Sequence, residues 1–122
     1  MNIGKHGEDV VVGEYLKKGY RIIGRNIRLH LTKQVGELDV ICTKDRILVF
    51  VEVKTRTNYA FGLGVDSVNY SKQRKLVKAV RLYLAQNRQY KDWVWRLDVA
   101  EVYIDSGKNA VIILENVIED LD

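Results

Sequence analysis

Charged side chains beside the most apolar segment of this sequence are the residues best suited to chemistry. The apolar run 47–51 is followed by Glu52 and Lys54, and Asp39 lies on the segment before the run. Because side chains alternate along a strand, Glu52 and Lys54 share one face if this segment is extended. Two carboxylates and an amine at the end of a central strand are typical of a catalytic or metal-binding centre.

These charges need compensation if they are buried in a sheet. Like charges on neighbouring strands destabilise the pairing, and burying an unpaired ion costs on the order of several kcal/mol. Asp39, Glu52 and Lys54 together carry a charge of −1. A divalent cation would turn this unfavourable cluster into a binding site, because carboxylate oxygens are suitable ligands for Mg²⁺. The alternative is a simple ion pair of Lys54 with Glu52 or Asp39 at the end of the strand.

Two further polar residues lie on apolar helix stripes, where their side chains would point inward. Glu8 is near the centre of the stripe of the first expected helix, and Gln73 is near the centre of the stripe of the second. Each residue taken singly has a simpler explanation. The helix dipole could stabilise the Glu8 carboxylate in the first turns of its helix, and Gln73 could form hydrogen bonds with the backbone. Together with the strand residues they predict one cleft lined by Glu8, Asp39, Glu52, Lys54 and Gln73.

The elements that must position these residues follow from hydrophobic periodicity and turn residues. Helices are expected at residues 3–18, ending at Gly19, and from a cap at Ser71 to about Asn87. Strands are expected at residues 20–31, 36–43, 46–54, 95–104 and 110–115, and a loop at 56–69 carries Tyr59 and Phe61. The order α-β-β-β-α-β-β predicts an α/β fold with a small mixed central sheet flanked by helices. The run 47–51 is apolar on both faces and is the expected central strand.

The turn between the second and third strands decides whether the two carboxylates meet. We expect a tight turn at Lys44-Asp45, which pairs Asp39 with Phe50 and makes Asp39 a diagonal neighbour of Glu52. A turn one residue later is the alternative. It is expected to change which face the residues share, because a one-residue slip exchanges the two faces of a strand.

The positive charge of the chain is segregated. The formal net charge is +4, and residues 16–35 and 67–91 contain six and seven Lys or Arg without a single acid. Such segregation suits a polyanionic partner such as nucleic acid, although an ordinary solvated helix face is the alternative. The residues expected to contact a phosphate backbone are Arg25, Arg28, Lys72, Arg74, Lys75 and Lys78.

The composition of the chain favours a globular protein and excludes several other classes. Of the 122 residues, 47% are hydrophobic and 30% charged, which predicts a single globular domain over 1–122 with an acidic tail at about 115–122. A single cysteine, Cys42, excludes an internal disulfide, and with only His6 and His30 it also excludes a four-ligand Cys/His zinc site. No apolar run approaches the roughly 18 residues of a membrane span, and no apolar signal-peptide core is present. We therefore expect a cytoplasmic protein without a membrane partner.

The spacing of the strand residues has a known counterpart. Asp39, twelve intervening residues and then Glu52-Val53-Lys54 resemble the PD-(D/E)xK nuclease signature. With the surrounding residues, the chain from residue 4 to about 115 resembles the YraN-type bacterial endonuclease-like family, which is similar to the archaeal Holliday-junction resolvases. The surrounding residues are Gly7-Glu8, Gly19-Tyr20, Arg25-Asn26, Gly36-Glu37-Leu38, Val49-Phe50-Val51, Thr55-Arg56, Lys72-Gln73-Arg74 and Arg96-Leu97-Asp98.

This resemblance implies a restriction-endonuclease-like core and a reaction centre. It implies that Asp39 and Glu52 bind Mg²⁺ or Mn²⁺ and that Glu8 adds a carboxylate from the first helix. It also implies that Lys54 serves the reaction and that Gln73 supports the site. A homodimer is expected if the resolvase analogy holds, because cutting two strands symmetrically needs two sites.

The expected function is a metal-dependent endonuclease that hydrolyses phosphodiester bonds in DNA rather than RNA, with branched DNA as one candidate substrate. A non-catalytic nucleic-acid-binding module on a nuclease fold is the alternative, and Glu52-dependent metal binding would separate the two. A protein-interaction subunit is the third interpretation, and it predicts no salt-dependent affinity for nucleic acid.

Overall fold

The computed structural model describes residues 2–57, 70–105 and 108–118. The elements follow the predicted order, each within two residues of its expected bounds, with a short 3-10 turn added. They are α1 (Ile3–Lys17), β1 (Arg21–His30), β2 (Gln34–Lys44), β3 (Ile47–Arg56), α2 (Tyr70–Gln86), η2 (Arg88–Tyr90), β4 (Val94–Asp105) and β5 (Lys108–Leu114). Most of the loop predicted at 56–69, with Tyr59 and Phe61, lies outside the described residues.

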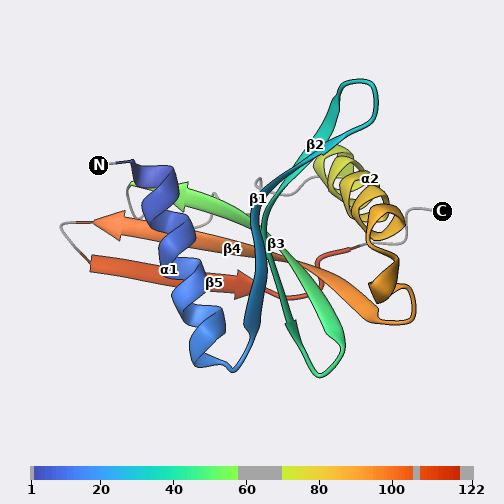
Figure 1. Cartoon of the computed structure of the whole chain (residues 1–122). Coiled ribbons are helices and arrows are strands. Elements are labelled where there is room, and N and C mark those ends of the chain that lie inside the picture. The colour runs from blue at the N-terminus through green and yellow to red at the C-terminus, as the bar shows by residue number, and fades with distance from the viewer. Residues whose placement is uncertain (1, 58–69, 106–107, 119–122) are drawn as a thin grey trace.

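Among the described residues the five strands form one sheet in the order β1-β2-β3-β4-β5. The β3 and β4 strands are parallel and the other neighbouring pairs are antiparallel, so the predicted mixed sheet is confirmed. Parallel neighbours need a crossover connection, and α2 lies in the connection between β3 and β4. In Figure 1, α1 crosses the sheet while α2 lies beside the β1–β2 hairpin. No helix in the described part of the chain is long and apolar enough to cross a membrane.

The central strand β3 is covered on both faces, as its sequence predicted. Leu48 and Phe50 pack in a core with α2, whereas Val49 and Val51 pack in a second core with α1. All four side chains are buried. This alternation places Glu52, two residues after Phe50, on the α2 face of the sheet.

The turn between β2 and β3 differs from the one we expected. Asp45 and Arg46 both have positive φ, 54° and 63°, which is the two-residue turn whose twist matches a β-hairpin. This turn lets Lys44 complete the ladder opposite Ile47. The prediction of a Lys44-Asp45 turn is therefore wrong.

The pairing of Asp39 with Phe50 is wrong for the same reason, because Phe50 pairs with Ile41. The expected exchange of faces does not occur either. Every residue of β2 moves by two places relative to β3, and a shift of two keeps each side chain on its face.

The β1–β2 hairpin extends beyond the end of the β2–β3 ladder. Pairing of β2 with β3 ends at Val40 opposite Val51, whereas pairing of β1 with β2 continues to His30 opposite Gln34. The projecting ribbon packs on α2, and Gly36 allows the approach because a Cβ there would lie 3.0 Å from the Cβ of Ala79. The β2 strand thus leaves β3 at Asp39.

A buried polar network fixes α1 to the rest of the fold. The Asp98 carboxylate is fully buried and accepts hydrogen bonds from the Tyr15 hydroxyl at 2.7 Å and the Arg96 Nε at 3.0 Å. The backbone amide of Asn116 donates a further bond at 3.0 Å. At the other end of α1, a Cβ on Gly7 would overlap the hydroxyl of Thr55. The first turns of α1 therefore lie directly against the end of β3.

Candidate functional site

Asp39 and Glu52 meet where β2 and β3 separate. The register of the two strands, continued by one residue, places them opposite each other. The Asp39 Oδ2 instead accepts a hydrogen bond from the backbone amide of Val53 at 2.9 Å. The carboxylate thus replaces the main-chain partner that Val53 would have in a continued ladder. Asp39 is held against β3 beside Glu52, and the predicted meeting of the two acids is confirmed.

Burial makes both carboxylates reluctant to ionise. Burial and, after it, the charge of Asp39 together raise the pKa of Glu52 to about 7, while Lys54 opposes the rise. Burial also raises the pKa of Asp39 from its ordinary value, although the Val53 amide lowers it, and the charge of Glu8 adds to the rise. Two like charges in a half-buried site repel each other, so near neutral pH the pair readily retains a proton.

Lys54 lies on the same face as Glu52, as strand alternation predicted. Its Nζ is 3.5 Å from the Glu52 Oε1, and the two side chains are 28% and 18% exposed. The simple ion-pair interpretation therefore describes this geometry. The same geometry also keeps an ammonium group next to the two carboxylates, where it could donate to an anionic ligand.

Glu8 is near enough to Asp39 for its charge to raise the pKa of that carboxyl, but its side chain is held by β1. Its Oε1 accepts a hydrogen bond from Asn26 Nδ2 at 3.1 Å and lies 3.5 Å from Arg25 Nη2. Within the described residues, no group of three or more His, Cys, Asp or Glu side chains is arranged to hold a metal ion. The structure therefore brings Glu8 to the neighbourhood of Asp39 without assembling the three acids around one point.

Gln73 is buried in the first turns of α2, with 6% of its surface exposed. Its inward orientation agrees with its place on the apolar stripe. However, it does not line the cavity next to Glu52. Gln73 is therefore buried under α2 and is not part of the cavity wall that contains Glu52.

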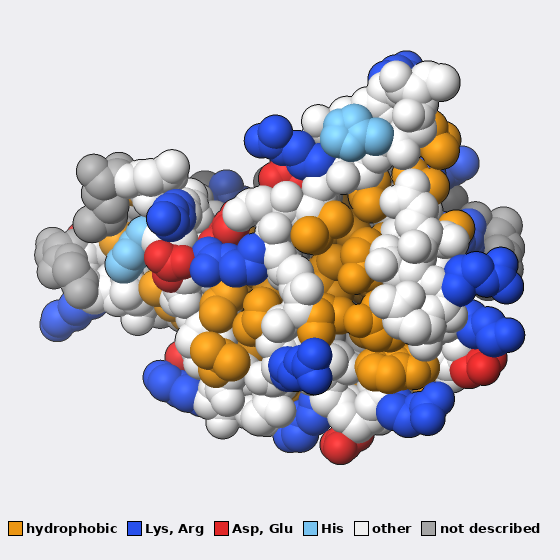
Figure 2. Space-filling model, in the orientation of Figure 1, with side chains coloured by type: hydrophobic (Ala, Val, Ile, Leu, Met, Phe, Trp, Pro, Cys, Tyr) orange, Lys and Arg blue, Asp and Glu red, His pale blue; other side chains and the backbone are white. Residues whose placement is uncertain are grey.

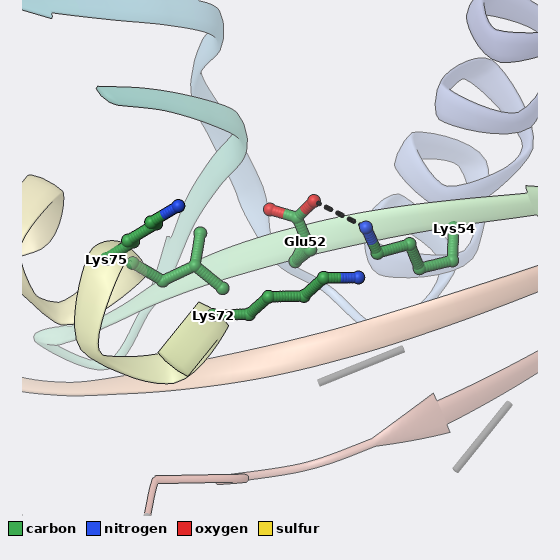
Figure 3. Close-up of a pocket in the computed structure, with 5 residues that line it drawn as sticks. Glu52, Lys54, Lys72 and Lys75 are labelled. Carbon is green, nitrogen blue, oxygen red and sulfur yellow. Dashed lines mark ion pairs between the residues drawn. The ribbon is translucent and has the colours of Figure 1, made fainter. Parts of the chain in front are cut away.

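A cavity of about 220 Å³ separates β3 from the start of α2. It is lined by Glu52, Lys54, Lys72, Lys75 and Leu76. In Figure 3 the side chain of Lys72 extends below Glu52, and that of Lys75 ends on the other side of the carboxylate. The sequence marked both lysines as backbone contacts but did not place them in the reaction centre. Their three-residue spacing at the start of a helix was the available signal.

The other basic residues singled out from the sequence lie away from this cavity. Arg25 forms ion pairs with two acids of α1. Its Nη2 lies 2.7 Å from the Asp9 Oδ1 and 3.5 Å from the Glu8 Oε1. Arg28, Arg74 and Lys78 are exposed. Figure 2 shows Lys and Arg side chains spread around the face it presents, without a single continuous patch.

Cys42 is completely buried in the core shared with α1, as expected for a small hydrophobic residue. Burial raises the pKa of its thiol to about 12. It therefore stays protonated near neutral pH and is unsuited to nucleophilic chemistry.

Comparison with known proteins gives a family without an activity in its description. The model of "Uncharacterised protein family UPF0102" matches residues 7–102, a segment that contains all five predicted site residues. A UPF0102 protein of Caldicellulosiruptor bescii is 40% identical over 118 residues, covering 97% of this chain and 94% of the relative. One of Alkaliphilus oremlandii is 41% identical over 115 residues, covering 93% and 95%. One of Clostridium perfringens is 38% identical over 117 residues, covering 94% and 92%.

Proposed function

This chain belongs to the uncharacterised protein family UPF0102, and we propose that it is a metal-dependent nuclease that hydrolyses phosphodiester bonds in nucleic acid. The observation that carries the proposal is the pair Asp39 and Glu52, held together at the divergence of β2 and β3 with Lys54 beside them. Buried like charges destabilise a fold, so a site that retains them is a candidate for function.

The donor set fits a hard divalent cation. Asp39 and Glu52 offer carboxylate oxygens, and their pKa values are raised first by burial and also by neighbouring carboxylates. Asp39 and Glu52 would hold Mg²⁺ or Mn²⁺, with Glu8 near enough to Asp39 to contribute through water. Such an ion acidifies a bound water and stabilises charge on a phosphate.

The chain's own residues supply positioning and charge. The Val53 amide fixes one oxygen of Asp39, and this leaves the other oxygen for a ligand. The Lys54 ammonium, next to Glu52, can turn to a phosphate oxygen and offset the negative charge that develops there. Glu8 is fixed by Asn26 and acts on the site through the charge it presents to Asp39.

The finer assignment rests on the resemblance set out above. The Asp39…Glu52-Val53-Lys54 pattern and the α-β-β-β-α-β-β order support a restriction-endonuclease-like core of the PD-(D/E)xK type. The same resemblance favours DNA over RNA and makes branched DNA of the Holliday-junction type one candidate substrate. Fold-level analogy identifies a class of reaction more securely than a particular substrate.

A cleavage assay tests the proposal directly. Labelled four-way junction, flap, single-stranded and duplex DNA would be incubated with Mg²⁺, Mn²⁺ or EDTA. We expect metal-dependent cutting by the wild type and its loss in Glu52→Gln and Lys54→Met. The matched control is Glu14→Gln, because Glu14 lies on α1 at the surface, paired with Lys17. Cutting that survives in Glu52→Gln would overturn the assignment of the site.

The second candidate function is a nucleic-acid-binding module without turnover. It is favoured by the Lys54–Glu52 ion pair, which already neutralises one acid, together with the lack of a three-acid cluster among the described residues. Under this function the chain binds DNA in a salt-sensitive manner and does not bind Mg²⁺ through Glu52. Calorimetric titration of Mg²⁺ into the wild type and Glu52→Gln separates the two functions.

A further inference from the structure

The charge around the reaction centre depends on two residues of α2. When both are ionised, Asp39 and Glu52 outweigh Lys54, so these three groups carry −1, and the charge of Glu8 beside Asp39 adds to the repulsion of an anion. The cavity beside them also contains Lys72 and Lys75, which bring the sum of the five groups to +1. The α2 lysines therefore offset the negative charge that would otherwise repel a phosphate from this place before any ion is bound.

The start of α2 adds to this positive field. The first turn of the helix, as far as the structure describes it, has no acidic residue, so its own side chains do not oppose the positive end of the dipole. Lys72 and Lys75 project from these first turns into the cavity, on either side of Glu52 in Figure 3. Leu76 supplies an apolar wall. Lysine ammonium groups are compact point charges with several donors, and this suits the oxygens of a phosphodiester.

We infer that Lys72 and Lys75 make this cavity a phosphate-holding subsite, which keeps a nucleic-acid strand against Glu52 in the absence of metal. The ligand named here rests on the proposed function, but the binding step is separate from cleavage. The cavity has room for a phosphate group, because its 220 Å³ equal several water molecules at roughly 30 Å³ each. On this inference, strand binding precedes the binding of the ion and does not require it.

The neighbouring basic residue Lys78 provides a matched comparison. It lies on α2, one turn beyond Lys75, and is exposed outside the cavity. Replacing either lysine by alanine removes the same charge from the same helix, and alanine favours the helix. Of these two lysines, Lys75 lines the cavity with Glu52 and Lys78 does not.

A double-mutant cycle in EDTA tests the subsite. The probe is a fluorescein-labelled single-stranded oligonucleotide, with its affinity read by fluorescence anisotropy at low salt. We expect Lys75→Ala to weaken binding about tenfold, as one charge-assisted contact would, and Lys75→Arg to restore most of it. Glu52→Gln should tighten binding severalfold, because it removes the negative charge facing the phosphate.

The coupling between variants identifies the place of binding. Lys75→Ala should cost more affinity in the Glu52→Gln background, where the ammonium is no longer attracted to the carboxylate. Lys78→Ala should cost the same in both backgrounds, because distant sites are additive. Thermal melting of each variant checks that the fold is intact.

The inference is overturned if Lys75→Ala behaves like Lys78→Ala, if the cycle is additive, or if binding requires Mg²⁺. These outcomes are distinct from failure of the nuclease proposal. Coupling between Lys75 and Glu52 without cleavage would support the subsite and reject catalysis. Cleavage that depends on Glu52 but not on Lys75 would support catalysis and reject the subsite.

Discussion

The carboxylate of Asp39 accepts a hydrogen bond from the backbone amide of Val53 across 2.9 Å. This bond lies one step beyond the last paired residues of the β2–β3 ladder. A side chain thereby satisfies a main-chain donor at the point where the sheet divides. Asp39 consequently has two roles, because it stabilises the end of β3 and contributes charge to the candidate site.

Substitutions at Asp39 should separate these two roles. Asp39→Ala leaves the Val53 amide without its acceptor, which should reduce the free energy of unfolding by about 1–3 kcal/mol. Asp39→Asn keeps an acceptor oxygen and removes the charge, so it should be at least as stable as the wild type at pH 8. Urea denaturation measures both. Equal losses in the two variants would show that the charge, and not the hydrogen bond, stabilises this junction.

The stability of the chain should fall as pH rises through the range in which Glu52 ionises. The folded-state pKa of Glu52 is about 7, above its ordinary value of 4.5. The folded protein therefore binds the proton more tightly than the unfolded chain, and this advantage is lost between about pH 4.5 and 7. Glu52→Gln should be more stable than the wild type at pH 8, by about 1–3 kcal/mol, and equally stable at pH 4.

Denaturation of both proteins across this pH range measures the effect. Glu14→Gln, at the surface of α1, serves as the control that should show no such pH dependence. Parallel curves for the wild type and Glu52→Gln would mean that Glu52 is not buried as described.

Magnesium should reverse the instability caused by the two acids. A ligand that binds only the folded state raises its stability, by about 2.7 kcal/mol at one hundred times the dissociation constant. Millimolar Mg²⁺ or Mn²⁺ should therefore raise the Tm of the wild type by several degrees at pH 8. The rise should disappear in Glu52→Gln and Asp39→Asn but remain in Glu14→Gln. Calorimetry with and without EDTA makes the comparison, and an equal rise in all four proteins would indicate a metal site elsewhere.

Two glycines of α1 should respond oppositely to alanine. A Cβ on Gly7 would overlap the hydroxyl of Thr55, whereas a Cβ on Gly13 would meet no atom within 4 Å. Gly7→Ala should force α1 away from β3 and cost about 1–3 kcal/mol. Gly13→Ala should stabilise the helix by up to about 1 kcal/mol. Thermal melts compare them, and a neutral Gly7→Ala would mean that α1 does not lie flush against β3.

The local pattern of apolar and turn residues in the sequence was sufficient to predict most of the fold. Element bounds followed from periodicity and from stops such as Gly19, and the apolar run of β3 identified the central strand correctly. The turn was misplaced because Asp45 and Arg46 both adopt positive φ. Asp45 suits the first position of such a turn, but Arg46 stands at the second position, where glycine is the usual residue.

The site was only partly accessible from sequence, for a related reason. Asp39, Glu52 and Lys54 could be identified because they interrupt apolar strands, and their faces follow from alternation. Which basic residue reaches the cavity depends on how α2 packs, and α2 is distant in sequence from β2. The pairing of Arg25 with Asp9 could not be foreseen either, since it joins α1 to β1. The same applies to the contact of Asp98 with Tyr15.

The tight hairpin between β2 and β3 fixes a length as well as a register. Five ladder pairs and two turn residues account for all twelve residues between Asp39 and Glu52. A single inserted or deleted residue anywhere in this interval would leave one acid without its neighbour, whereas a change of two could be absorbed as one more or one fewer rung. The hairpin thus fixes the number of residues between the two acids, and this number can change only by two at a time if the acids are to stay neighbours.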